Sequence, residues 1–194
     1  MKIAVITRPN FFVGECDLIN KMFQCGLPLL HIRKPDADIT AVENLLLSID
    51  PAYYGRVVMN DFHSLAVKYN LYGIHLNRRN PSVIDNWNGS VSRSTHSFQE
   101  LSLDVDKYDY SFLSPIFDSI SKDNYVSGFS MSQLQKAALE GVINDKVFAL
   151  GGVTVDRIAL LKSLYFGGAA LLGEVWNNAD NIEAYMHHLL LAAL

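Results

Sequence analysis

A histidine and an arginine stand at the end of a short apolar run, and both residue types can hold a phosphate or diphosphate. His31 and Arg33 lie two residues apart, so an extended strand would direct both side chains to one face. Burying such groups is costly unless they meet a partner or a ligand, and the fork of an arginine matches the oxygens of a phosphate. The pair therefore indicates a phosphate or diphosphate site, with an internal ion pair as the alternative.

An asparagine and an aspartate end the next apolar run, where they could bind a ligand and a metal. Asn60 and Asp61 follow Val58-Met59. A carboxylate is a preferred ligand of Mg²⁺, and Asn60 could reach a heteroatom of a bound molecule. Asp61 could instead cap a helix that begins at Phe62, because Asp is a favoured N-cap residue. Both interpretations of Asp61 are open at this point.

Hydroxyl groups and an imidazole gather just before another expected helix. They lie in the segment Ser94-Thr95-His96-Ser97. Hydroxyl groups at a helix start suit an anion, and a histidine can transfer protons near neutral pH. The segment indicates an anion-binding or acid–base site, although His96 could equally be an ordinary histidine at a helix start.

Two further kinds of segment have the composition of phosphate-binding loops. Ser119, Ser121 and Lys122 lie in one polar stretch, which would form a lid over a phosphate unless it is an ordinary surface loop. Gly151-Gly152 end another apolar run just before an expected helix, where backbone amides can approach a phosphate closely. Leu172-Gly173 end the last apolar run in the same way.

Eight short apolar runs, often β-branched, are typical of strands. They are Ile3–Thr7, Leu29–Arg33, Arg56–Met59, Gly73–Leu76, Ser90–Arg93, Tyr110–Leu113, Val147–Leu150 and Ala169–Leu172. The segments between and after them predict helices at Glu15–Gln24, Ala37–Ile49, Phe62–Tyr69, Ser97–Leu101, Ser130–Leu139, Thr154–Ser163 and Asn178–Leu190. Ser130 with Gln133 three residues later forms a capping-box pattern, and Thr154 is the expected N-cap of the next helix.

Strands that alternate with helices fit two architectures, a closed (β/α)₈ barrel and an open doubly wound sheet. A length of 194 residues is short for the barrel, whereas eight strands favour it. We predict a compact α/β TIM barrel that forms a single domain over residues 1–194, with an irregular connection at Arg78–Gly89 in place of one helix. In such a barrel, the strand ends that carry the polar residues meet at one face.

Composition argues against several other classes of protein. The formal net charge of −4 disfavours nonspecific nucleic-acid binding, which needs a clustered basic face. No apolar run approaches the roughly 20 residues of a membrane span, and the N-terminal run is too short for a signal peptide. Cys16 and Cys25 lie nine residues apart, without the spacing of metal ligands. We expect reduced thiols in a soluble, cytoplasmic protein.

In their order along the chain, these segments resemble the thiamine phosphate synthase and thiazole tautomerase superfamily. The resemblance covers nearly the whole chain and is carried by Leu30–Arg33, Val58–Asp61, Gly73–Leu76, Ser94–Ser97, Ser114–Lys122 and Ala149–Val153. It implies, for the synthase, that hydroxymethylpyrimidine diphosphate ionises to diphosphate and a pyrimidine cation. The thiazole nitrogen of hydroxyethylthiazole phosphate would then capture this cation to give thiamine phosphate.

The resemblance also implies roles for individual residues. Arg33 and Lys122 would be catalytic, because they would stabilise the leaving diphosphate. The pyrimidine diphosphate would bind His31, Arg33, Asn60, Ser94 and Lys122, and the thiazole phosphate would bind Ser119, Ser121, Gly151, Gly152, Leu172 and Gly173. Mg²⁺ would be the cofactor, held by Asp61 and Asn80. The partners would be phosphorylated small molecules, and barrels of this kind often associate as homodimers.

Four positions depart from the synthase pattern. Synthases usually have Gln where His31 stands, Lys where Pro35 stands, and a second Mg²⁺-binding Asp where Asn80 aligns. They commonly have Ser where Gly173 stands, a smaller departure because a backbone amide still serves. Asn is a weaker ligand for Mg²⁺ than Asp, because hard cations favour carboxylate oxygen. These differences should weaken diphosphate binding, unless Lys34 replaces the missing Lys.

The tautomerase branch of the superfamily provides the main alternative function. There the His-Ile-Arg form of the second strand is familiar, and His96 would transfer the proton that isomerises a thiazole carboxylate phosphate, without Mg²⁺. Asp61 and Ser119-Ile120-Ser121-Lys122 are synthase-like instead. The synthase is therefore the predicted function, with the tautomerase and a divergent, noncatalytic phosphate-binding protein as alternatives.

Overall fold

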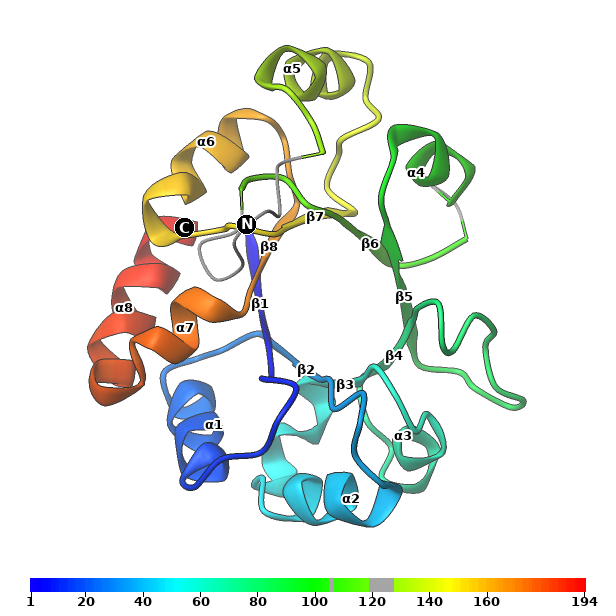
Figure 1. Ribbon diagram of the computed structural model, residues 1–194, viewed down its shortest axis with the longest axis vertical. Coiled ribbons are helices and arrows are strands. Elements are labelled where there is room, and N and C mark those ends of the chain that lie inside the picture. The colour runs from blue at the N-terminus through cyan, green and yellow to red at the C-terminus, as the bar shows by residue number, and fades with distance from the viewer. Residues whose placement is uncertain (105–106, 119–127) are drawn as a thin grey trace.

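The computed structural model shows a closed barrel of eight parallel strands, as predicted (Figure 1). It describes residues 1–104, 107–118 and 128–194. The strands are β1 (Lys2–Ile6), β2 (Leu29–Ile32), β3 (Val57–Met59), β4 (Gly73–Leu76), β5 (Ser90–Thr95), β6 (Tyr110–Leu113), β7 (Val147–Leu150) and β8 (Gly168–Leu171). Neighbouring strands pair in sequence order, and the pairing of β1 with β8 closes the ring.

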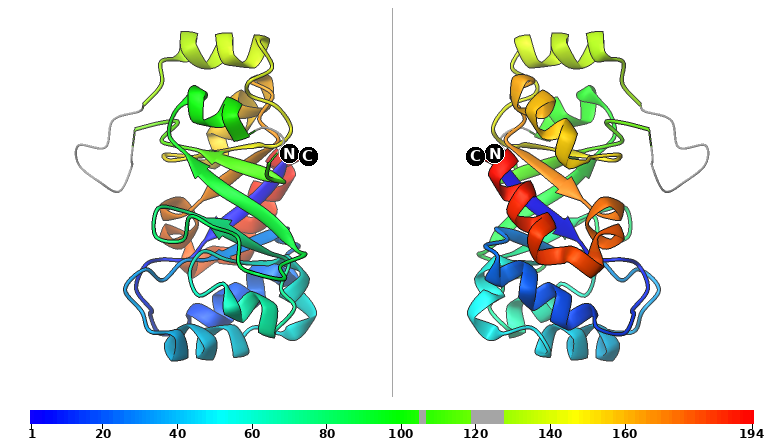
Figure 2. Two further views of the ribbon diagram at one scale, coloured as in Figure 1. Left: turned by 90° about the vertical axis from the view of Figure 1, so that its right-hand side faces the viewer. Right: turned by 90° about the vertical axis from the view of Figure 1, so that its left-hand side faces the viewer.

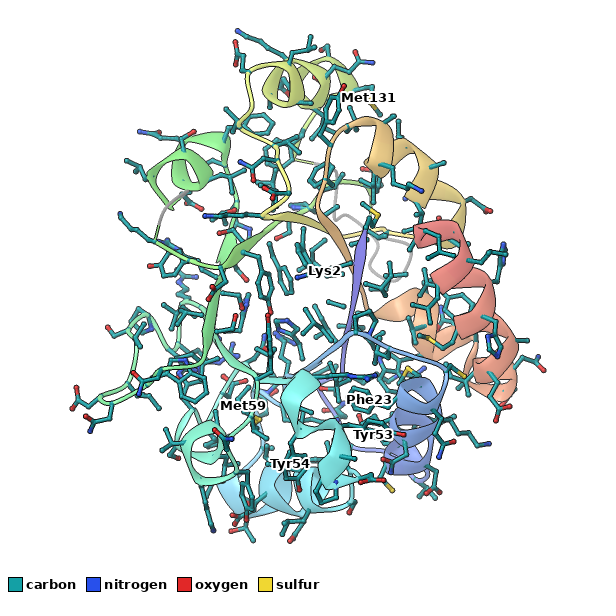
Figure 3. All side chains as sticks on the ribbon, turned by 180° about the vertical axis from the view of Figure 1, so that it is seen from behind. Lys2, Phe23, Tyr53, Tyr54, Met59 and Met131 are labelled. Atoms are coloured by element: carbon teal, nitrogen blue, oxygen red, sulfur yellow. The ribbon has the colours of Figure 1, made fainter. Side chains whose placement is uncertain are left out.

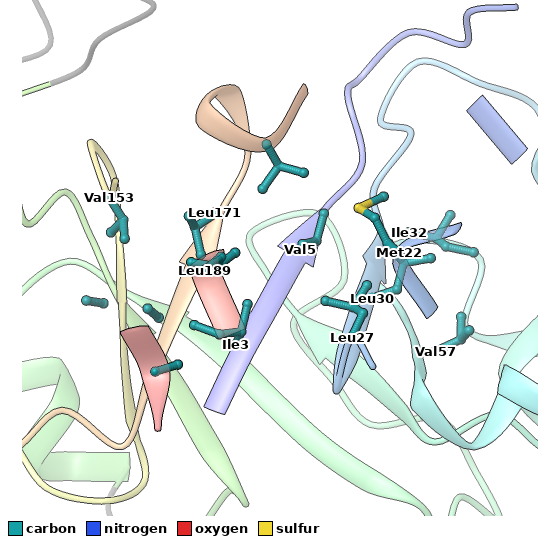
Figure 4. Close-up of a cluster of buried hydrophobic side chains, with 14 of the residues drawn as sticks. Ile3, Val5, Met22, Leu27, Leu30, Ile32, Val57, Val153, Leu171 and Leu189 are labelled. Carbon is teal, nitrogen blue, oxygen red and sulfur yellow. The ribbon is translucent and has the colours of Figure 1, made fainter. Parts of the chain in front are cut away.

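Apolar side chains pack in two layers, one inside the ring of strands and one between the strands and the helices. All residues of β2, β3, β4, β6 and β8 are buried, as expected for parallel strands that are covered on both faces. One cluster, which includes Ile6, Phe112 and Phe148, lies inside the ring. A larger cluster joins the strands to the helices, and Figure 4 shows part of it, including Ile3 of β1 and Leu189.

Helices surround the ring of strands in Figure 1. They are α1 (Glu15–Gln24), α2 (Ile39–Leu47), α3 (Ser64–Lys68), α4 (Phe98–Asp104), α5 (Met131–Leu139), α6 (Ile158–Ser163), α7 (Gly173–Asn177) and α8 (Ile182–Ala193), with short 3₁₀ turns η1 (Pro51–Arg56), η2 (Val155–Arg157) and η3 (Ala179–Asn181). Within the described part of the chain, no helix is long and apolar enough to cross a membrane.

Aromatic packing and a terminal hydrogen bond fix helices against their neighbours. Phe23 of α1 stacks on Tyr53 of η1, with ring centroids 4.7 Å apart (Figure 3). Helix α8 packs against α1, α6 and β1, and Figure 2 shows that it brings the two termini together. There the amino group of Met1 donates to the carbonyl of Ala193 at 2.6 Å.

Of the predicted helix caps, the one at α5 is confirmed. The backbone N–H of Gln133 donates to the hydroxyl of Ser130, and the side chain of Gln133 accepts from the backbone of Ser130 at 2.8 Å. Thr154 stands at the N-cap position of η2, but its side chain makes no capping hydrogen bond. The prediction that Thr154 caps an α-helix was therefore wrong: a 3₁₀ turn follows it, and helix α6 begins only at Ile158.

The predicted cap at Asp61 was also wrong. Phe62 has a φ of 53°, in the left-handed region, so the chain is not yet helical there. Helix α3 begins only at Ser64, with His63 as its N-cap residue. The carboxylate of Asp61 is therefore available for other partners.

The connection between β4 and β5 contains no helix, as predicted. It instead folds back over the end of β3. The side-chain amides of Asn77 and Asn80 both donate to the carbonyl of Asn60, at 2.7 and 3.2 Å. This irregular connection therefore brings Arg79, which lies between the two asparagines, to the mouth of the barrel.

Candidate active site

A pocket of about 340 Å³ opens at the carboxyl ends of the strands, on the side of β5 to β8, β1 and β2. Most of the predicted site residues that the structure describes meet here. The pocket is lined by Arg33, Ser94, His96, Gly151, Gly152, Leu172 and Gly173, together with apolar groups such as Ile6, Leu150 and Val153. An apolar cleft with a few convergent polar groups is typical of a small-molecule site.

The two glycines after β7 adopt a backbone that other residues rarely adopt. Their φ angles are 95° for Gly151 and 60° for Gly152. A Cβ on Gly151 would approach Pro115 to 2.9 Å, and one on Gly152 would collide with the carbonyl oxygen of Asp118. Arg157 donates to the carbonyl of Gly152 and so holds the turn from behind. The turn therefore needs glycine at both positions, and glycine lets a ligand come close to the backbone amides.

His96 lines the pocket with one ring nitrogen already engaged. Its Nδ1 lies 3.0 Å from the carbonyl oxygen of Ser114. The hydroxyl of the same residue lies 3.3 Å from Nδ1. In the tautomer that donates from Nδ1 to the carbonyl, Nε2 of the neutral ring can accept a hydrogen bond. The backbone N–H of His96 donates to Glu100 at 2.7 Å, which fixes the residue at the end of β5. This geometry suits a residue that takes up or releases a proton.

Ser94 is positioned in the pocket by a buried histidine. The Nε2 of His75 lies 2.8 Å from the hydroxyl of Ser94, and its Nδ1 lies 2.8 Å from that of Ser92. Burial holds the pKa of His75 well below its usual value, and the nearby basic groups His31, His63 and Arg33 lower it further. His75 is therefore neutral, with one nitrogen that donates and one that accepts.

His31 lies inside the ring, beneath the pocket and outside its lining. Its Nδ1 contacts the side-chain oxygen of Asn60 at 3.0 Å, and its Nε2 contacts the hydroxyl of Tyr110 at 2.8 Å. Burial lowers the pKa of His31 to about 3, although the bond with Asn60 acts in the opposite direction. His31 is thus a neutral, fully bonded part of the barrel interior, and its partners are neutral rather than ionic.

Asp61 forms an ion pair with Arg79 from the connection between β4 and β5. Nη2 of Arg79 lies 2.8 and 3.1 Å from the two carboxylate oxygens, and Nε lies 3.1 Å from Oδ1. The side-chain amide of Asn80 also donates to Oδ1, at 3.0 Å. The two residues predicted to hold Mg²⁺ are therefore neighbours, but they are bonded to each other and to a guanidinium.

Lys34 has a partner that prevents it from replacing the missing Lys at Pro35. Its ammonium is fully buried and lies 2.7 Å from Oε1 and 2.8 Å from Oε2 of Glu15. Burial raises the pKa of Glu15, an effect that Lys34 opposes, and burial lowers the pKa of Lys34. The ammonium also lies 4.5 Å from the ring of Phe11. Lys34 therefore joins the loops after β1 and β2 and does not face the pocket.

Ser119, Ser121 and Lys122 lie outside the described residues. The pocket also contains polar residues that sequence reasoning did not select, namely Ser114, Glu174 and Asn177. Ser114 and Glu174 directly follow strand or site positions that were selected, so a closer inspection of every strand end could have found them. Arg79 had no comparable signal, because it lies in a connection without periodicity.

The donor set at Asp61 does not fit Mg²⁺ as the residues stand. Mg²⁺ binds oxygen ligands at about 2.0–2.1 Å in octahedral geometry. Oδ1 of Asp61 already accepts from Arg79 Nε, Arg79 Nη2 and Asn80 Nδ2, and Oδ2 accepts from Nη2. Nor do three or more His, Cys, Asp or Glu side chains cluster anywhere among the described residues in a way that could hold a metal ion.

Comparison with known proteins places these features in one family. A family model described as thiamine monophosphate synthase matches residues 3–175. The thiamine-phosphate synthase of Serratia proteamaculans is 25% identical over 179 residues, covering 87% of this chain and 83% of the relative. That of Salmonella typhimurium is 22% identical over 191 residues, covering 94% and 90%.

Solved structures agree with this similarity. The crystal structure of thiamine phosphate pyrophosphorylase from Bacteroides thetaiotaomicron is 37% identical, with a TM-score of 0.90, and the match covers 100% of this chain and 98% of that one. Thiamine phosphate pyrophosphorylase from Pyrococcus furiosus has a TM-score of 0.76 at 17% identity, covering 99% and 95%, and shows the same fold.

Proposed function

The chain belongs to the thiamine monophosphate synthase family, and on this premise we propose that it joins hydroxymethylpyrimidine diphosphate to hydroxyethylthiazole phosphate. The products are thiamine phosphate and diphosphate. The observation that carries this proposal is the pocket at the strand ends, where the paired glycines after β7 face Arg33 and Ser94. This pocket suits a small phosphorylated heterocycle.

The phosphate of the thiazole binds at the ends of β7 and β8. Gly151, Gly152 and Gly173 line this corner of the pocket, and backbone amides at such strand ends form the recurrent phosphate site of these barrels. Leu172 contributes an apolar contact to the ring. Ser119 and Ser121 complete this site in the proposal, which for them rests on the resemblance alone.

The reaction breaks a carbon–oxygen bond and forms a carbon–nitrogen bond. The diphosphate leaves with the bonding electrons, and the lone pair of the thiazole nitrogen attacks the resulting pyrimidine cation. The protein must oppose the growing negative charge on the diphosphate and hold both substrates in line. Arg33 and Lys122 supply the positive charge, while Ser94 and Asn60 orient the pyrimidine. His31 supports Asn60 from beneath.

No step of this proposal is assigned to a metal at Asp61. The resemblance implies Mg²⁺ held by Asp61 and Asn80, but the carboxylate is bonded to Arg79. The chemistry that we derive therefore uses the cations of the chain itself.

The direct test is product formation from the two purified substrates, followed by chromatography of thiamine phosphate. We expect the wild-type protein to form it and Arg33→Gln to lower kcat/KM about 100-fold, because a preorganised charge in the pocket is lost. Arg78→Gln removes an equal charge from an exposed position and should have little effect. If the wild-type protein forms no thiamine phosphate, the proposal is rejected.

A second candidate function, thiazole tautomerase, is favoured by the position of His96. Its Nε2 can exchange a proton in the pocket, while Nδ1 is held by Ser114. A tautomerase should isomerise thiazole carboxylate phosphate and should lose this activity in His96→Gln. A synthase should keep most of its coupling activity in that variant. His187→Gln, on the exposed face of α8, is the matched control. Binding without turnover of either substrate set would indicate a noncatalytic protein.

We also propose that the enzyme acts in the cytoplasm on phosphorylated small molecules and has no nucleic-acid partner. The acidic composition, with a net charge of −4, supports the last point. A homodimer is the assembly that we propose, and light scattering of the purified protein tests it.

A further inference from the structure

Arg79 stands where the synthase pattern would have a divalent cation. It forms a two-pronged ion pair with the carboxylate after β3, with contacts of 2.8 to 3.1 Å between Arg79 and Asp61. A guanidinium matches a carboxylate in this arrangement and holds it more firmly than a point charge would. The position beside Asp61 is thus already filled by a cation that belongs to the chain.

The asparagine that follows Arg79 in the sequence is consistent with a guanidinium in the place of a metal ion. A second carboxylate at position 80 would add a negative charge that one arginine could not balance. Asn80 instead donates its amide N–H to Oδ1 of Asp61 at 3.0 Å. With one carboxylate and one guanidinium, the group is neutral without any bound ion, and Oδ1 already accepts three hydrogen bonds. A metal ion could bind Asp61 only by displacing Arg79.

The guanidinium keeps an edge for a ligand. Nε and Nη2 of Arg79 contact Asp61, and no hydrogen bond joins Nη1 to any other described residue. The side chain is 46% exposed, against 10% for Asp61. The backbone N–H of Arg79 donates to the side chain of Asn77 at 2.9 Å, which anchors the residue at the mouth. Arg79 is therefore held in place on one edge and open on the other.

We propose that Arg79 is the chain's own cation for the diphosphate of the pyrimidine substrate, in the place that a divalent metal would take. This inference rests on the proposed synthase function. Asp61 follows β3, which lies between the strands that lead to Arg33 and Arg79, so the two guanidinium groups flank one strand end. Arg33 binds from the pocket side and Arg79 from the β4 side, and Asp61 positions Arg79 without touching the ligand.

Titration calorimetry with inorganic diphosphate tests this directly. The wild-type protein is titrated once in EDTA and once with excess Mg²⁺. We expect the two dissociation constants to agree within about threefold, since Arg79 supplies the charge. In EDTA, Arg79→Gln should weaken binding about tenfold or more, as expected for the loss of charge-assisted hydrogen bonds. Arg78→Gln, with the same change in net charge, should bind like the wild type.

A double variant separates a direct contact from simple repulsion. Arg79→Gln leaves the carboxylate of Asp61 without a compensating positive charge, and this carboxylate would then repel diphosphate. The variant Asp61→Asn/Arg79→Gln removes both charges, and we expect it to bind as weakly as Arg79→Gln. Thermal unfolding of each variant confirms that the barrel is folded before it is titrated.

Three results would overturn the inference. The first is that the wild-type protein binds diphosphate only with Mg²⁺, or not at all. The others are that Arg79→Gln binds diphosphate as tightly as Arg78→Gln does, and that the double variant regains the affinity of the wild type. The coupling assay is separate. Diphosphate binding through Arg79 without any thiamine phosphate formation would reject the proposed function alone, whereas coupling with Mg²⁺-dependent diphosphate binding would reject the inference alone.

Discussion

The two sides of the barrel mouth differ in what their polar groups are bonded to. On the side of β5 to β8, an open pocket of about 340 Å³ is lined by the glycines after β7, by apolar groups and by polar side chains such as Ser94 and His96. On the side of β2 to β4, the polar side chains are bonded to each other: His31 to Asn60 and Tyr110, and Asp61 to Arg79. One side is an open pocket, and on the other side Asp61 and His31 are bonded to protein partners, while Arg79 keeps one edge open.

This difference indicates that different residues of the barrel determine ligand binding and the stability of the fold. The open side owes its shape to the backbone, since Gly151 and Gly152 have positive φ angles that exclude a Cβ. The bonded side owes its shape to buried polar groups, which must be fully satisfied or become costly. Substitutions on the first side should therefore change ligand binding, whereas those of the buried groups on the second side, such as His31 and Tyr110, should change stability first.

The largest effect should come from acid, on the bonded side. Burial lowers the pKa of His31 to about 3 and that of His75 well below its usual value, so both are neutral in the fold but take up protons in the unfolded chain below pH 6.5. Their contribution is complete above that pH and is lost as the pH falls; for His31 the loss continues towards pH 3, at about 1.4 kcal/mol for each pH unit.

Urea unfolding between pH 7.5 and 4.5 measures this loss, and His31→Gln provides the comparison. Glutamine keeps a polar group at the position but cannot titrate. The free energy of unfolding of the variant should fall less steeply, by about 1.4 kcal/mol per pH unit. Parallel slopes for the two proteins would mean that His31 is not held neutral.

A smaller effect, measured in catalysis, should follow from Gly152→Ala on the open side. A Cβ there would collide with the carbonyl of Asp118 and displace the turn after β7. We expect kcat/KM for coupling to fall about 100-fold, as misplacement of a binding group by about 1 Å does. Gly55→Ala is the control, because a Cβ at Gly55 would meet nothing within 4 Å. Equal activities for the two variants would contradict the role of the glycine turn.

The smallest effect should come from Tyr110→Phe, again on the bonded side. The Nδ1 of His31 donates to Asn60, so its Nε2 accepts from the hydroxyl of Tyr110. Phenylalanine leaves this buried acceptor without a partner, which should lower the free energy of unfolding by about 1–2 kcal/mol. Tyr165→Phe, at an exposed tyrosine, should leave stability unchanged. A large loss of kcat/KM in Tyr110→Phe at unchanged stability would place Tyr110 in the site instead.

Local patterns predicted the barrel and the open side of its mouth. Three of the predicted strands have the expected bounds, namely Gly73–Leu76, Tyr110–Leu113 and Val147–Leu150. They could be predicted because a short apolar run between turns is visible in the local sequence. The glycine pair after β7 was recognisable for the same reason: the backbone conformation that requires glycine is set within two residues.

The bonded side could not be predicted, because its partners are distant in sequence. Asp61 reads equally as a helix cap and as a metal ligand until Arg79, eighteen residues away, is seen beside it. The sequence indicates a phosphate ligand at His31, because nothing in it shows that the hydroxyl of Tyr110, 79 residues away, donates to the imidazole. Lys34 and Glu15 likewise meet only because the loops after β1 and β2 adjoin. Such pairs follow from barrel closure and from loop paths that have no periodic pattern.

The most direct test of the difference between the two sides is titration calorimetry of hydroxyethylthiazole phosphate into the free protein, with no pyrimidine diphosphate present. Because the pocket on the side of β5 to β8 is already formed, we predict saturable binding of this substrate alone, weakened in Gly152→Ala and unchanged in Tyr110→Phe. Absence of binding at millimolar concentrations, or binding that Gly152→Ala leaves intact, would contradict the central claim that this side is the preformed thiazole phosphate site.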